Sequence, residues 1–308
     1  MLLLMNIRSS LQSVRGLEVH RTTKHRVWRR FILTTLVFGL IASGTLPGRA
    51  QTGPLVVGLD AGTNPFVIVN PDGSLTGFNI DLVTEVAKRL GRPGVQVVDQ
   101  QFSGIFAGLE GKRYEFIAAP VTLTKERSSR MLFVQGYLDT NYQFLIRQDG
   151  ADIATLDDLK GKTIAVNNGS AYDTWLTQNA DKYGFKIERY GKTGDAYQAV
   201  LARRAEVAMS DDGNARYAAA KNRQLKPSYL IKTGAVFSWA FRKDDDATRR
   251  RVEQTLKCMK LDGTIARIFK TWFGEDPDPS SASVTVRAGY GQPGMDDFEA
   301  VYEAPKCE

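Results

Sequence analysis

The chain has 308 residues and a formal net charge of +7, and this length allows one large or two modest domains. The first 50 residues hold eight of the 41 Lys and Arg, only one of the 34 acids and both histidines, so residues 51–308 are neutral overall and contain no histidine. This composition gives no reason to expect nucleic acid as a partner, and it excludes Ser-His-Asp and Cys-His catalysis and His-ligated zinc from residues 51–308.

The N-terminal segment has the features of a secretory signal peptide. A basic run at residues 26–30 precedes the uncharged apolar residues 31–46, and Gly48 and Ala50 place small residues three back and one back from the Ala50–Gln51 bond. The apolar run is shorter than the roughly 20 residues that a membrane-spanning helix needs. We therefore expect residues 1–50 to be a cleavable leader and the mature protein to be periplasmic.

The next elements predict a mostly parallel α/β sheet. Residues 55–59 are expected to form a strand, residues 70–74 a turn, and Ile80, Val83, Ala87 and Leu90 one face of a helix that stops at Gly91. Further strands at residues 95–98 and 116–119 enclose a helix at 102–109. This order of strands and helices is typical of α/β domains.

After an extended run at residues 143–147, a second α/β pattern follows. The expected helices are 156–159, 170–179, 196–204 and 214–221, and the expected strands are 163–166, 186–190 and 207–210. A strand at 236–242 and helices at 247–260 and 264–273 complete the pattern. The remainder is rich in Pro, Gly, Ser and acids without a sustained period, which predicts an extended tail.

The chain contains two cysteines, Cys258 and Cys307. An even count in an exported protein favours one disulfide, which would join the tail to a late helix. The alternative is one buried thiol and one free thiol in the tail.

The first candidate for ligand chemistry follows the strand that ends at Ala119. Thr122, the N–H groups of a helix start and Arg127 one turn later could together hold a carboxylate through a bidentate contact. The alternative is a Thr helix cap with a solvated Arg.

Two more strand ends carry polar residues. Ser170 and Asp173 resemble a capping box, although the N–H groups of Ser170 and Ala171 could instead bind an anion. Asp211 and Asp60 each stand at the end of a strand, where open α/β sheets place ligand groups, but both also suit an ordinary turn.

Together, the following segments resemble the polar-amino-acid family of extracytoplasmic solute-binding proteins, the receptors of ABC importers. The likeness covers about residues 54–274. The segments are Val-Val-Gly-Leu-Asp at 56–60 with Asn-Pro-Phe at 64–66, Asp-Gly at 72–73 with Gly-Phe-Asn-Ile-Asp-Leu at 77–82, Phe-Ser-Gly-Ile at 102–105, Thr-Leu-Thr-Lys-Glu-Arg at 122–127 with Phe133, Leu-Asp-Asp-Leu-Lys-Gly-Lys at 156–162, Val-Asn-Asn-Gly-Ser at 166–170, and Lys-Leu-Asp-Gly-Thr at 260–264 with Trp-Phe-Gly at 272–274.

The resemblance implies a periplasmic-binding-protein type II fold, in which two α/β lobes are joined by two crossing strands and close over a ligand. Lobe 1 would comprise residues 54–141 and 234–275, lobe 2 residues 142–233, and the tail residues 276–308. It also implies a non-enzyme, most simply a monomer without cofactor or metal, that delivers an amino acid or related carboxylate to the membrane subunits of an ABC importer.

The resemblance further implies roles for individual residues. Thr122 and Arg127 would bind the ligand carboxylate with the Ala171 N–H, Asp211 would bind the ammonium, Phe102 would pack on the ligand, and Asp60 would face its side chain. Ala119 and Ser170 complete the expected ligand-binding set.

Two residues depart from the family pattern. Pro120 replaces the usual Gly, and Thr63 stands where many members carry an aromatic residue. Because of these departures, the resemblance does not determine the identity of the ligand. Two alternative functions remain: a dehydratase on the same fold that uses Asp60 or Asp211 as an acid, and an accessory or sensor protein whose tail docks a partner.

Overall fold

The computed structural model describes residues 53–307. The expected signal peptide lies outside the described residues. A nine-stranded sheet with the order β4-β1-β5-β11-β7-β10-β8-β9 forms the centre, and β6 pairs with β11 beside this path. In the described part of the chain, no helix is both long and apolar enough to cross a bilayer.

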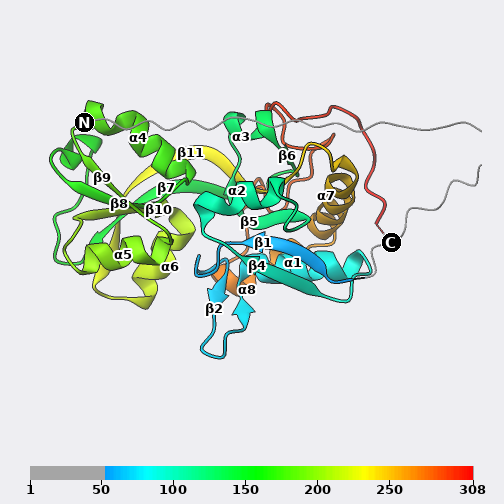
Figure 1. The fold of residues 1–308 in the computed structure, drawn as a ribbon, viewed down its shortest axis with the longest axis horizontal. Helices are drawn as coiled ribbons and strands as arrows, with labels where there is room; N and C mark the ends of the chain where they lie inside the picture. Colours follow the sequence, from blue (N-terminus) through cyan, green and yellow to red (C-terminus); the bar gives the residue numbers. More distant parts are fainter. Residues whose placement is uncertain (1–52, 308) are drawn as a thin grey trace, which may run out of the picture. The chain divides into compact units, whose positions relative to one another are not determined.

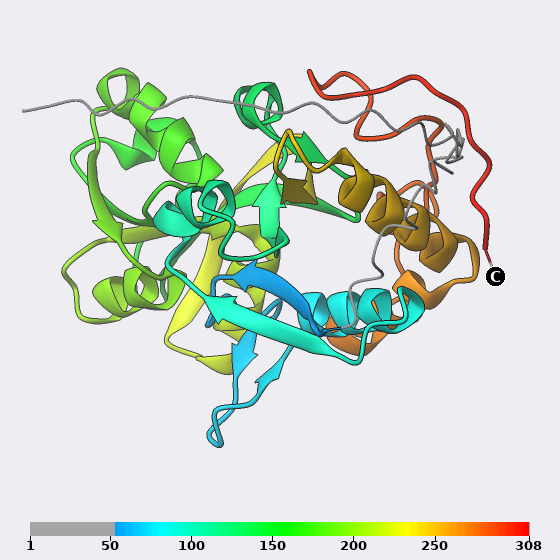
Figure 2. The same ribbon diagram turned by 45° about the vertical axis from the view of Figure 1, so that its right-hand side comes forward.

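The first half of the sheet contains three parallel strands, β1 (Leu55–Leu59), β4 (Val95–Asp99) and β5 (Phe116–Thr122). Four helices pack here. They are α1 (Phe78–Arg89), α2 (Phe102–Glu110), α7 (Asp246–Leu261) and α8 (Thr264–Phe273). Helix α1 contacts both α7 and α8, and α1 and α7 lie side by side, in cyan and gold, in Figure 2. One large apolar core holds this half together.

The second half of the sheet is covered on both faces. Its strands are β7 (Leu138–Arg147), β8 (Thr163–Asn167), β9 (Lys186–Tyr190) and β10 (Val207–Asp211). Consecutive strand residues point to opposite faces, so Phe144 packs with α4 (Ala171–Tyr183), whereas Leu145 packs with α5 (Thr193–Leu201) and α6 (Asp212–Lys221). Two separate apolar cores result.

Strands β7 and β11 (Leu225–Phe241) run through both halves of the sheet, as Figure 1 shows. They pair with each other in antiparallel register, and β11 then pairs with β5 and with β6 (Leu132–Phe133). The ladder between them is interrupted between Ile231 and Ala235, where Gly234 adopts a positive φ of 64°. Thr233 Oγ1 donates to the carbonyl of Thr140 at 2.6 Å across this interruption. The expected pair of crossing strands is confirmed.

Several predicted boundaries were wrong, and one predicted helix has a different type. Strands β7 and β11 begin five and eleven residues earlier than expected, respectively, because their first halves mix polar residues with apolar ones and are defined by pairing with each other. Helix α5 begins at Thr193 and ends at Leu201, since Arg203 adopts a positive φ of 59°. The expected helix at 156–159 is a 3₁₀ turn, η1 (Leu156–Leu159).

Three smaller elements complete the fold. The predicted turn at residues 70–74 is confirmed, and it joins two strands of two residues each, β2 (Ile68–Val69) and β3 (Leu75–Thr76). Helix α3 (Lys125–Arg130) follows β5, and the Thr124 side chain caps it by accepting from the N–H of Arg127.

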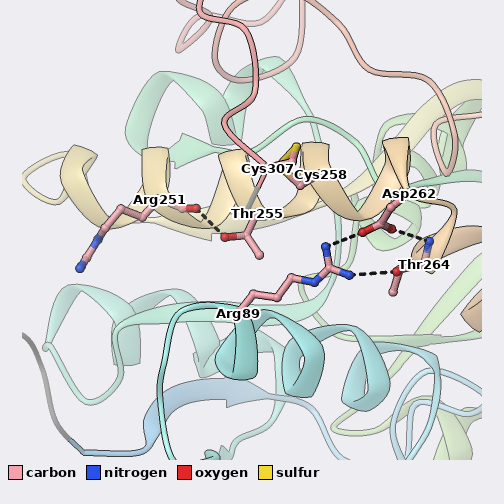
Figure 3. The surroundings of a disulfide bond; sticks show 7 residues. All are labelled: Arg89, Arg251, Thr255, Cys258, Asp262, Thr264 and Cys307. Atoms are coloured by element: carbon pink, nitrogen blue, oxygen red, sulfur yellow. Dashed lines mark hydrogen bonds and ion pairs between the residues drawn. A yellow bond between two sulfur atoms is a disulfide. The ribbon is translucent and has the colours of Figure 1, made fainter.

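The tail after α8 is attached to α7, and Figure 3 shows the disulfide between Cys258 and Cys307 that fixes its end. The bond, with Cα atoms 5.4 Å apart, confirms the predicted pairing. Beyond α8, the described residues form no helix or strand except for a bridge between Tyr290 and Glu299.

The tail also covers a polar stripe of α7. Glu253 accepts from the N–H of Gly291, and the ammonium groups of Lys257 and Lys260 donate to the carbonyls of Gly289 and Thr285 at 2.5 and 3.0 Å. Burial lowers the pKa of Lys260 to about 7. The tail thus lacks regular structure, as expected, but it is packed against the protein.

Candidate ligand-binding site

A small cavity of about 20 Å³ lies where the carboxyl ends of several strands from both halves of the sheet meet. The strands β1, β5, β8 and β10 end there, and the helices α2, α4 and α5 begin there. The lining residues are Asp60, Thr63, Phe102, Pro120, Thr122, Asn167, Ser170, Ala171, Tyr172, Thr193, Asp211 and Phe237. Six of the eight residues that the sequence singled out as ligand-binding therefore share one cavity.

Asp60 follows the last residue of β1 and is only 2% exposed. Its carboxylate Oδ1 accepts from the ammonium of Lys192, in the second half of the sheet, at 2.6 Å. Burial raises the pKa of Asp60 to about 6, although Lys192 opposes the shift. Asp60 is thus a partly neutralised anion on the cavity wall.

Asp211 ends β10, is 3% exposed and caps helix α6. Its carboxylate accepts from the backbone N–H and from the side-chain amide of Asn214. No cationic side chain among residues 53–307 forms an ion pair with Asp211, and burial raises its pKa to about 7. The turn-forming role and the cavity-lining position are therefore combined in one residue.

Arg127 lies beside the cavity rather than among its lining residues. Its guanidinium donates to the carbonyls of Thr122 at 2.8 Å and Gly169 at 3.0 Å, and it stacks near the rings of Phe102 and Phe106. Burial lowers the pKa of Arg127 to about 10, and no carboxylate of the described residues pairs with it. It lines a neighbouring hollow together with Ala171 and Tyr142.

The start of α4 has only one half of the predicted capping box, because the N–H of Ser170 donates to the carbonyl of Asn167 and not to the Asp173 carboxylate. Ser170 Oγ accepts from the N–H of Asp173 at 3.0 Å, and the Asp173 carboxylate accepts from the N–H of Gly169 at 2.9 Å. Ala171 is the first residue of the helix, where backbone N–H groups have no partner within the helix. The cap therefore orients the helix start toward the cavity without occupying every donor.

The remaining expected residues differ in position. Phe102 begins α2 and lines the cavity, and Thr122 ends β5 there. Ala119 is fully buried within β5 and is not a lining residue, whereas its neighbour Pro120 is. The two departures noted in the sequence, Thr63 and Pro120, thus both face the candidate site.

Several cavity residues were not predicted from the sequence. Tyr172 and Thr193 follow helix starts, Asn167 ends β8, and Phe237 lies in β11. The N-terminal turn of α4 could have indicated Tyr172, because Ala171 was already a candidate. No local signal indicated Lys192, which stands in a Gly-Lys-Thr-Gly segment typical of a turn.

A second hollow of about 320 Å³ adjoins the cavity between α6 and α8 and shares Asp211 and Phe237 with it. Its walls are mainly aromatic and apolar, including Phe66, Phe269 and Trp272. The smaller cavity is the better candidate site because it gathers the buried carboxylates and the helix starts. Residues 53–307 contain no cluster of three or more His, Cys, Asp or Glu that could hold a metal ion.

Comparison with known proteins agrees with this geometry. Residues 55–275 match the family described as bacterial extracellular solute-binding proteins, family 3. The L-cystine-binding protein TcyJ of Escherichia coli K12 is 30% identical over 239 residues, covering 76% of this chain and 87% of TcyJ.

Two solved structures extend the comparison. An ancestral arginine-binding protein bound to arginine aligns with a TM-score of 0.69 and 28% identity, covering 73% of this chain and all of the other. The ancestral amino acid-binding protein AncCDT-1, a precursor of cyclohexadienyl dehydratase, aligns with a TM-score of 0.67 and 30% identity, covering 72% and 96%. The predicted two-lobed fold is confirmed.

Proposed function

This chain belongs to the bacterial extracellular solute-binding proteins, family 3, and from that premise we propose that it captures one small zwitterion and delivers it to the membrane subunits of an ABC importer. The observation that carries the proposal is a pair of opposite charges in adjoining positions, since Asp211 lines the cavity and Arg127 lines the hollow beside it. Arg127 has no carboxylate partner, and Asp211 has no cationic partner, among the described residues. Buried charges of this kind are stable only when they are paired.

An α-amino acid supplies both missing partners. Its carboxylate would contact Arg127, Thr122 and the N–H of Ala171, and its ammonium would contact Asp211. Phe102 would pack against the apolar atoms of the ligand, Asp60 would face its side chain, and Ala119 and Ser170 would support the two ends. These roles rest on the family resemblance and on the position of each residue around the cavity.

We propose that the lobes are residues 54–141 with 234–275, and residues 142–233. The apolar cores support this division, since one core comprises residues of the first set with Ala282 and Met295 of the tail, and the two other cores are confined to the second set. Arg127 reaches from one set to the Gly169 carbonyl of the other. Because ligand contacts would come from both lobes, binding would favour the closed arrangement.

The relatives narrow the ligand class to amino acids, with L-cystine and arginine as examples of what similar proteins bind. A thermal-shift screen of the amino acids, cystine and related carboxylates would identify the ligand, because a molecule that binds only the folded state raises the melting temperature. If no amino acid shifted the melting temperature, the proposed function would be wrong.

We also propose that residues 1–50 direct the protein to the periplasm and are removed there. Intact-mass measurement of the periplasmic fraction should give a chain that begins at Gln51. A monomer that does not bind nucleic acid is expected as well, and light scattering with a nucleic-acid filter-binding assay would check both points.

Ligand affinity should depend on pH through Asp211. Its pKa of about 7 means that protons compete with the ligand ammonium for this carboxylate as the pH falls. Between pH 8.5 and 6.5 we expect the affinity to fall about fourfold, since a raised pKa means that the ionised, binding-competent form is lost near neutrality. Calorimetry over this range measures the effect.

Asp211→Asn is the control for this prediction, because Asn can still cap α6. The variant should bind weakly and with little change across the same pH range. If the affinity of Asp211→Asn depended on pH in the same way as that of the wild type, the titrating group would be a residue other than Asp211.

A dehydratase function is a second candidate, because the two buried carboxyl groups with pKa values near neutrality, Asp60 and Asp211, could act as acids. Similarity to AncCDT-1 also favours it. Binding without catalysis remains our proposal, since Lys192 and Asn214 already engage these carboxylates. Ultraviolet detection of aromatic product from a cyclic precursor would decide between the two.

The tail could instead dock a partner, as an accessory or sensor protein would require. Its contacts with α7 favour a stapling role within the chain. A chain truncated before Pro277 that folds normally but loses a specific partner would support docking.

A further inference from the structure

Lys192 joins the proposed lobes at the wall of the cavity. It precedes helix α5, and its ammonium donates to Asp60 Oδ1 at 2.6 Å and to Asp99 Oδ1 at 3.0 Å, both in the first half of the sheet. Asp60 is almost completely buried, whereas the Lys192 side chain is 28% exposed. Asp60 is therefore a lining residue of the cavity, and Lys192 holds it from outside the lining.

This pair changes the electrostatics of the part of the cavity that would receive the ligand side chain. The ligand carboxylate and ammonium are assigned to Arg127 and Asp211, so Asp60 remains for the side chain. An unpaired Asp60 would attract a cationic side chain, but here a cation already occupies it. A cationic ligand side chain would have to share Asp60 with Lys192, and two positive charges that contact the same carboxylate repel each other.

An anionic side chain is also disfavoured, because Asp60 and Asp99 both lie next to Lys192. A neutral polar group, in contrast, fits both members of the pair. An ammonium has three donors, of which Lys192 uses two, and a carboxylate can accept several hydrogen bonds. One group could therefore donate to Asp60 while it accepts from Lys192.

We infer that Lys192 is a specificity-determining residue that selects amino acids whose side chains carry no net charge and both donate and accept hydrogen bonds. The inference rests on the proposed function and names the ligand class for the same cavity. A carboxamide is the simplest such group, and a second zwitterionic end also has no net charge.

The test is calorimetry with the twenty amino acids and L-cystine on the wild type and on Lys192→Met. For the wild type, the tightest ligand should have an uncharged, hydrogen-bonding side chain, and L-arginine should bind at least about tenfold more weakly. Lys192→Met should reverse this order, since Asp60 then lacks its cation. Lys186→Met, an exposed position on β9, is the matched control and should keep the wild-type ranking.

Asp60→Asn provides an independent variant if Lys192→Met does not fold. It leaves the Lys192 charge in place and should improve L-glutamate binding relative to L-glutamine by about tenfold. A wild type that prefers L-arginine, L-glutamate or an apolar amino acid, or a ranking unchanged in both variants, would overturn the inference. Binding of no amino acid at all would instead refute the proposed function, and the inference with it.

Discussion

Replacing Arg127 with Ala should weaken binding of the cognate ligand by about thirtyfold or more, roughly 2–5 kcal/mol, because the ligand carboxylate would lose its only charged partner. Arg127 is partly buried, and no carboxylate within residues 53–307 competes for its guanidinium. Removal would therefore leave a desolvated ligand carboxylate with N–H and hydroxyl donors alone. Calorimetry with the ligand found by thermal shift measures the change.

Arg130→Ala is the matched control for this prediction. Arg130 lies on the same helix, α3, but its side chain is 72% exposed and forms only a surface pair with Glu126 at 3.7 Å. Its removal should change affinity by less than about twofold. Comparable melting temperatures would show that both variants fold, and wild-type affinity in a folded Arg127→Ala protein would refute the carboxylate role.

Loss of the disulfide should lower the free energy of unfolding by about 4 kcal/mol, the value that the chain-entropy model gives for a loop of this length. Cys258 and Cys307 are 49 residues apart, and the bond holds the tail over the polar stripe of α7. Urea unfolding of Cys258→Ala and Cys307→Ala measures the change.

The double variant distinguishes the bond from the packing of each cysteine. It should lose about as much stability as either single variant, because both single variants break the same bond. Ligand affinity should stay within about twofold of the wild type, since neither cysteine lines the cavity. Additive losses would show that the side chains, and not their bond, stabilise the protein.

The sequence predicted the helices and strands well wherever burial follows a simple period. Strand β1 was predicted at its observed bounds, because Leu55, Val57 and Leu59 are fully buried and the segment is apolar. Strand β11 was found only at its apolar end. Its first half contains Lys226, Ser228 and Lys232, and it is held by pairing with β7, whose partner residues are more than 75 positions away.

The candidate site shows the same distinction. Asp60, Thr122 and Asp211 could be predicted because strand ends in α/β sheets are identifiable from local sequence. Lys192 could not, since its partner Asp60 lies 132 residues away and its own segment resembles a turn. Ala119 was predicted to bind the ligand, but its neighbour Pro120 lines the cavity instead, because a strand places alternate residues on opposite faces.

The interruption between β7 and β11 has a mechanical consequence. Two hydrogen-bonded strands resist shear along their length, but they bend where the ladder is broken and where a glycine allows unusual backbone angles. The interruption at Gly234, next to the Ala235–Thr140 pair, places such a flexible point at the boundary between the proposed lobes, and a second interruption lies between Pro227 and Leu230. Closure should thus be a bending motion at that boundary, so a distance probe that spans the lobes should report a shorter separation when the ligand is added.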